Sequence, residues 1–181
     1  MNILKKICEN KKREVNYDKK FNSYSSLEKL INKNDRNRNF KNLLIKKNQL
    51  KENNIIGEIK KFSPSAGNII NNYNPITIAK SYEESGIGAL SILTDEKFFG
   101  GKLEDLSLVS KSIKLPILRK DFIIDPYQVL QSKLFKADAI LIIMSILSFS
   151  QAKEILDTAN NYNIDCLIEV HNIDEMEPAL K

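Results

Sequence analysis

The chain has 181 residues, of which 42% are hydrophobic and 28% charged, and its formal net charge is +5. This length favours one domain with a sizeable core, and the longest apolar run, Ala139 to Leu147, is too short to span a bilayer. No N-terminal segment has the apolar core of a signal peptide, and the two cysteines form no CxxC or Cys/His metal motif. We therefore expect a cytoplasmic protein with reduced thiols, no bound metal and no membrane association.

Positive charge is concentrated in residues 1–54, which hold 15 Lys and Arg against 6 Asp and Glu. Residues 55–181 hold 13 against 17, so the two parts carry +9 and −4. A basic arm of this kind can contact RNA, or it can be a solvated helical surface. Because no nucleic-acid-binding motif accompanies the charge, we expect the solvated surface and no nucleic-acid partner.

The first 54 residues predict a helical extension. An apolar stripe at helical spacing indicates a first helix, and it consists of Ile3, Leu4, Ile7 and Val15. Ser25-Ser26-Leu27-Glu28 has the pattern of a capping box that opens a second helix. From Ile55 onward, strands and helices alternate, and apolar strand candidates begin near Ile55, Gly88, Leu115, Asp138 and Asp165. Their spacings of 33, 27, 23 and 27 residues each fit one βα unit.

Helix-start signals lie between these strands. Asn74-Pro75 and Asp125-Pro126 each offer an N-cap residue followed by proline at the first helical position. Ser148 to Gln151 has the capping-box pattern and leads into Ala152–Ala159. Alternating βα units require parallel strands, either in a doubly wound sheet or in a TIM barrel. A Rossmann glycine fingerprint and a P-loop are absent, and polar residues recur at the strand ends, so the sequence favours the barrel.

Charged residues stand at the predicted carboxyl ends of the strands, where barrel enzymes assemble their sites. Glu58 and Lys60 lie two residues apart on the first strand and therefore point the same way. Burying such a pair is costly unless the charges pair or take part in chemistry. Thr94-Asp95 ends the second strand, Lys120 the third and Glu169 the fifth. Two lysines and two glutamates at one edge can supply general acids and bases, although each charge taken alone is also explained as a solvated strand end.

Five segments in sequence resemble indole-3-glycerol phosphate synthase, an enzyme family of tryptophan biosynthesis. They are EIKKFSPSAG, LSILTDEKFFGG, LPILRKDFIIDPYQV, ADAILIIMSIL and CLIEVHNIDEMEPAL, and EIK-x-x-SPS together with KDF is the specific part. The match covers essentially the whole chain. It implies one α/β domain over residues 1–181, of the TIM (β/α)8 barrel family, with an N-terminal helical extension at 1–54. Residues 55–181 would hold βα units 1 to 5, with the barrel truncated after about the fifth.

The resemblance implies conversion of 1-(o-carboxyphenylamino)-1-deoxyribulose 5-phosphate to indole-3-glycerol phosphate. The ring closes, carbon dioxide and water are lost, and no cofactor is used. In this reaction Lys120 looks like the general acid that protonates the ribulose carbonyl. Lys60 looks like a clamp on anionic groups of the substrate and an acid in dehydration, and Glu58 resembles its orienting or proton-moving partner. Glu169 resembles a base or electrostatic stabiliser at the anilinium centre.

The resemblance also implies substrate contacts. Phe99 and Phe122 look like walls against the anthranilate ring, and Leu141 like a floor. The alternative is that all three are ordinary core residues. Ser63 is expected near the phosphate, or as a plain turn residue. Ala66 stands where the family commonly has lysine, which would weaken attraction of the substrate.

A full barrel of this type has about 250 residues, so the resemblance predicts strands 6 to 8 beyond Lys181. Five strands alone would leave two open sheet edges. Two hypotheses follow. The chain is the N-terminal portion of the enzyme and takes a phosphorylated small molecule, or it is a non-catalytic remnant that serves as a structural or partner-binding piece. Fusion to, or association with, a neighbouring tryptophan-pathway enzyme is left open.

Overall fold

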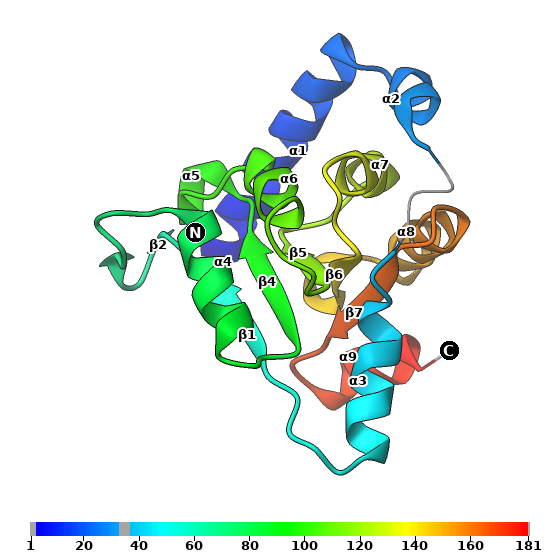
Figure 1. Ribbon diagram of the computed structural model, residues 1–181. Helices are drawn as coiled ribbons and strands as arrows, with labels where there is room; N and C mark the ends of the chain where they lie inside the picture. Colours follow the sequence, from blue (N-terminus) through cyan, green and yellow to red (C-terminus); the bar gives the residue numbers. More distant parts are fainter. Residues whose placement is uncertain (1–2, 33–36, 181) are drawn as a thin grey trace.

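The computed structural model describes residues 3–32 and 37–180. Its centre is a five-stranded sheet in which every strand pair is parallel (Figure 1). The strands are, in spatial order, β1 (Ile56–Ile59), β4 (Ala89–Leu93), β5 (Ile117–Lys120), β6 (Ala139–Ile143) and β7 (Asp165–Glu169). Each strand neighbours the next one along the chain, whereas a doubly wound sheet reverses its order at a switch point. The predicted barrel-type order is therefore confirmed, with β1 and β7 as the edge strands of the sheet.

Helices connect the strands. They are α4 (Pro75–Glu84), α5 (Glu96–Phe99), α6 (Glu104–Ser110), α7 (Pro126–Leu134), α8 (Phe149–Asn161) and α9 (Ile173–Ala179), with a 3₁₀ turn η1 (Met144–Ile146) after β6. The predicted start signals are confirmed, because Asn74 and Asp125 accept backbone hydrogen bonds at the starts of α4 and α7. Ser148 and Gln151 form both halves of the capping box of α8. After β1, a small hairpin of β2 (Phe62–Ser63) and β3 (Gly67–Asn68) precedes α4.

Alternation along the strands separates two faces of the sheet. One face packs against the connecting helices, and its buried residues include Ile59, Ile92 and Ile117. The other face carries Leu118 and Ala139, which pack with Phe40 of α3 (Phe40–Gln49) at the amino-terminal side of the strands. We call these the outer and the inner face. Successive residues of β5 therefore alternate between the helix layer and the interior that α3 covers.

The helical extension differs in part from the prediction. The first helix, α1 (Ile3–Phe21), buries Ile7 and Val15 as expected, but Ile3 is 48% exposed because it lies at the helix end. The capping box at Ser25 was wrong: α2 (Tyr24–Leu30) begins two residues earlier, because Ser23 is the N-cap and accepts from the backbone of Ser26.

Helix α3 was not predicted. Its N-cap residue, Asn39, is of a type that favours this position, but it has a left-handed backbone with φ 53° and makes no side-chain cap hydrogen bond. Contacts with a distant part of the chain hold the segment before α3 in place. Asp138, at the start of β6, accepts from the backbone and the guanidinium of Arg38 and from the backbone of Ile117, each at 2.8 Å. Tertiary contacts of this kind position a helix that local sequence does not announce.

Candidate active site

Glu58 lies between two lysines at the carboxyl end of the sheet. Its two carboxylate oxygens accept from Lys60 Nζ at 2.6 Å and from Lys120 Nζ at 2.8 Å. Lys120 comes from β5, two strands away from β1, and the side chains are 29% to 39% exposed. Burial would raise the pKa of Glu58, but the hydrogen bonds from Lys120 and Lys60 outweigh it and lower that pKa. Glu58 is therefore a carboxylate at neutral pH that holds two ammonium groups together.

Glu169 does not join this group among the contacts that the structure records. It ends β7, on the same sheet edge, and lies 3.3 Å from Nε2 of His171 in the loop that follows. His171 also approaches Glu175 of α9 through Nδ1 at 3.3 Å. Of the two lysines and two glutamates that we expected to meet, three are in contact, whereas Glu169 faces the loop that follows its own strand.

The expected substrate contacts fall into two kinds. The rings of Phe99 and Phe122 face each other, with centroids 6.1 Å apart and planes tilted by 34°, so α5 and the β5 loop place them side by side. Leu141 is 4% exposed in the middle of β6. Ser63 is buried, and its hydroxyl accepts from the backbone of Ala66, so it closes the turn that follows it. The hydroxyl thereby fixes the hairpin, as a turn residue does.

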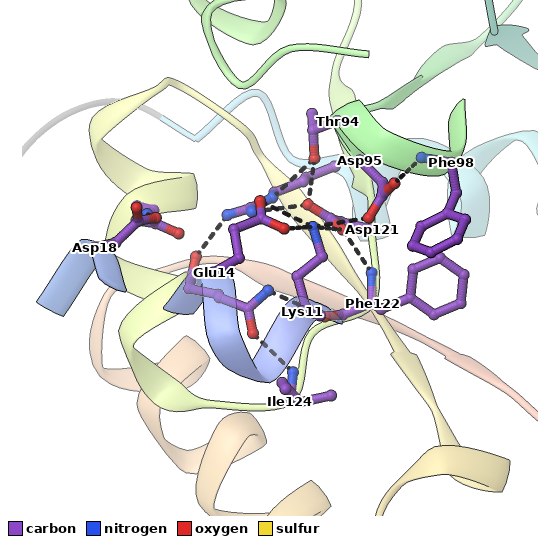
Figure 2. Close-up of polar contacts among 12 residues, drawn as sticks. Lys11, Glu14, Asp18, Thr94, Asp95, Phe98, Asp121, Phe122 and Ile124 are labelled. Carbon is purple, nitrogen blue, oxygen red and sulfur yellow. Dashed lines mark hydrogen bonds and ion pairs between the residues drawn. The ribbon is translucent and has the colours of Figure 1, made fainter. Parts of the chain in front are cut away.

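A second charged cluster lies on the outer face of the same strand ends. Lys11 of α1 forms ion pairs with Asp95 and with Asp121, both at 3.0 Å, and all three side chains are 1% exposed (Figure 2). It also pairs with Glu14 of its own helix at 3.1 Å. Arg119 donates to Asp121 at 2.9 Å and is also nearly inaccessible. A role for Lys11 was not predicted. The sequence does indicate that Lys11 is buried, because it lies four residues after Ile7 and four before Val15, inside the apolar stripe of α1.

The pKa values of this cluster follow from its geometry. Burial would lower the pKa of Lys11, but the carboxylates of Asp121 and Asp95 raise it. Burial would likewise raise the pKa of Asp121, but Arg119 and Lys11 lower it. Both charged forms are therefore stabilised by their partners, as a buried ion pair requires.

A large cavity lies apart from Glu58 and its two lysines. It has a volume of about 1230 Å³ and lies between α1 and α6, lined by residues such as Glu14, Leu108 and Arg119 but not by Glu58 or Lys120.

Within residues 3–32 and 37–180, no group of three His, Cys, Asp or Glu side chains is arranged to hold a metal ion. None of the helices in that part of the chain is long and apolar enough to cross a membrane.

Comparisons with known proteins agree with the sequence resemblance. A family model described as indole-3-glycerol phosphate synthase matches residues 4–181. A protein of that name from Zymomonas mobilis subsp. pomaceae is 44% identical over 180 residues, which are 99% of this chain and 68% of the relative. One from Acinetobacter baumannii is 41% identical over 99% of this chain and 65% of its own length. One from Leptospira interrogans is 51% identical over 126 residues, 70% of this chain and 50% of the relative.

The chain therefore spans 50% to 68% of the length of these relatives. Among solved structures, MenC from Desulfotalea psychrophila LSv54 superposes with a TM-score of 0.51 at 12% identity, over 76% of this chain and 37% of that one. At this identity the likeness concerns the α/β fold alone. The consecutive parallel strands, the match along residues 4–181 and the identity to longer relatives show that the chain belongs to the indole-3-glycerol phosphate synthase family of TIM-barrel proteins.

Proposed function

We propose that the chain carries the strand 1 to 5 part of an indole-3-glycerol phosphate synthase active site. The substrate would be 1-(o-carboxyphenylamino)-1-deoxyribulose 5-phosphate. In the reaction, the ring carbon that bears the carboxylate bonds to the ribulose carbonyl carbon, and carbon dioxide and then water leave. The observation that carries the proposal is the Glu58 carboxylate bridging Lys60 and Lys120 at 2.6 and 2.8 Å. A charged donor held at a rigid strand end is what protonation of a carbonyl requires.

We assign roles on that basis. Lys120 is the general acid for the ribulose carbonyl oxygen, and Lys60 binds the anionic groups of the substrate and assists the loss of water. Glu58 orients both ammonium groups. Glu169 stabilises the cationic centre that precedes decarboxylation, since a fixed carboxylate lowers the energy of a developing positive charge nearby. Its present partner His171 would release it when the substrate binds, because the 3.3 Å contact is long and solvent-exposed.

The remaining residues would shape the pocket. The paired rings of Phe99 and Phe122 offer an apolar wall of the size of an anthranilate ring. Leu141 supplies the floor, and the turn that Ser63 closes lies next to Lys60 in the chain and would face the phosphate. A phosphorylated substrate of this kind is retained inside cells, so we place the protein in the cytoplasm.

The test is formation of indole-3-glycerol phosphate by the 181-residue chain, followed by indole fluorescence, with substrate binding measured by calorimetry. We expect Lys120→Met to lower kcat by about 10²- to 10⁴-fold, the usual contribution of a general acid, with KM changed little. Lys47→Met is the matched control, because Lys47 pairs with Glu52 on the surface at 2.6 Å. Normal kcat in Lys120→Met would refute its role. Substrate binding by the unaltered chain without turnover would instead favour the non-catalytic remnant.

A further inference from the structure

The residues on either side of Lys120 are held by the buried cluster on the outer face. β5 ends in Arg119-Lys120 and Asp121 follows directly, and alternate residues of an extended chain point to opposite faces. Lys120 points to the inner face, where it meets Glu58. Its two neighbours point outward, and both are at most 3% exposed. The position of the Lys120 backbone therefore depends on what holds Arg119 and Asp121, in addition to the hydrogen bond that its own oxygen accepts from the backbone of Thr94 at 3.3 Å.

Asp121 is fully occupied by partners. Its Oδ1 accepts from the backbone of Phe122 at 2.8 Å and faces Lys11 at 3.0 Å. Its Oδ2 accepts from Thr94 at 2.6 Å and from Arg119 at 2.9 Å. Thr94 follows β4, so Asp121 already joins the ends of two neighbouring strands. A carboxylate with this many partners has little freedom to move.

Lys11 makes a second connection between the ends of β4 and β5. Figure 2 shows its side chain reaching from α1 to the space between Asp95 and Asp121. Asp95 is also the N-cap of α5, where its other oxygen accepts from the backbone of Phe98 at 2.7 Å. The ammonium of Lys11 thus connects the helix that carries Phe99 with the strand that carries Lys120. Without it, two carboxylates would face each other in a site that excludes water, and their repulsion would separate the strand ends.

We propose that Lys11 is a positioning residue: by bridging Asp95 and Asp121 on the outer face, it fixes the spacing of the β4 and β5 ends and thereby the place of Lys120 on the inner face. This inference rests on the proposed function for the meaning of Lys120, but the placement itself can be measured without the reaction. Lys11 does not touch the substrate in this proposal. It acts through the backbone of β4 and β5.

The test uses the full chain and a variant in which the buried charge stays balanced. Lys11→Met together with Asp95→Asn removes one positive and one negative buried charge and leaves Arg119 with Asp121. It also removes the ion pair between Lys11 and Glu14 at 3.1 Å, whose carboxylate is 40% exposed and can be solvated. The asparagine introduced in this variant has no cation to bridge, yet it can still cap α5. Asp95→Asn alone is the second variant, in case the double change does not fold. Lys11→Arg is the conservative variant, since it keeps a cation at the same place.

Two measurements follow each variant. The first is the acylation rate of Lys120 by an acetylating reagent, read by mass spectrometry on folded protein. We expect it to rise at least about twofold, which corresponds to the lower end of coupling energies between contacting groups. The second is kcat, which we expect to fall about 10- to 100-fold, because a misplacement of about 1 Å can cost 100-fold. Lys11→Arg should restore both values toward those of the unaltered chain.

The control is Lys19→Met. Lys19 also anchors α1, through an ion pair with Asp125 at 2.6 Å, but it does not touch the ends of β4 and β5. It should leave the acylation rate of Lys120 unchanged. Equal rates in the double variant and the unaltered chain, or an equal rise in Lys19→Met, would overturn the proposal. If the unaltered chain shows no turnover, the proposed function fails, while the acylation rate still decides whether Lys11 positions Lys120.

Discussion

The buried guanidinium of Arg119 offers the sharpest test of how the strand ends are held. It donates to Asp121 at 2.9 Å, to the backbone oxygen of Gln128 at 3.0 Å, and to the hydroxyls of Ser132 and Thr94, both at 3.1 Å. Arg119→Met keeps the volume of the aliphatic stem and removes all four bonds.

The expected cost follows from what each acceptor keeps. Gln128 O still accepts from the Ser132 hydroxyl at 2.7 Å, so the neutral acceptors are only partly stranded. Asp121 retains Lys11 and loses one of its two cations. Breaking a buried ion pair from one side costs about 3–5 kcal/mol, which is a large part of the roughly 5–15 kcal/mol that stabilises a typical domain.

Urea unfolding followed by circular dichroism measures this cost, with the slope m checked for constancy. Lys47→Met is again the control, because its pair with Glu52 is 34% and 50% exposed and should be worth under about 1 kcal/mol. A loss in Arg119→Met no larger than in the control, at unchanged m, would refute the view that this cluster holds the strand ends.

Two further predictions follow from single positions. Gly101→Ala should lower the melting temperature and cost at least about 1–3 kcal/mol, because an added Cβ would lie 2.0 Å from the backbone oxygen of Leu93; an unchanged melting temperature would show that the loop moves freely. Glu58→Gln should lower the free energy of unfolding at pH 7 by an amount that shrinks as the pH falls. The pKa of Glu58 is lowered in the folded state by Lys120 and Lys60 against burial, so its contribution is present above the unfolded value of about 4.3 and is lost as the pH falls through the folded value. A pH-independent difference between the two proteins would contradict this.

Local sequence determined much of the architecture. Apolar runs of four to five residues, the caps at Asn74, Asp125 and Ser148, and the spacing of the βα units required parallel strands with connecting helices. The Glu58 and Lys60 pair was also predictable, because a period of two places both residues on one face. These features depend on neighbours within one turn or one strand, which is the range over which sequence patterns act.

Other features were decided only by contacts between distant segments. Helix α3 has no side-chain cap hydrogen bond at its start and is positioned by packing of Phe40 with buried residues of three strands. Glu169 lies at the expected edge but faces His171, since the direction of a side chain at a strand end is set by the loop that follows. Lys11 lies 84 residues from Asp95 in the chain, and only the docking of α1 on the outer face makes it a partner of the strand ends. The charges at those ends could be read from the sequence, but which of them would meet depended on how the strands and α1 pack, because pairing of buried charges is settled by distance in space.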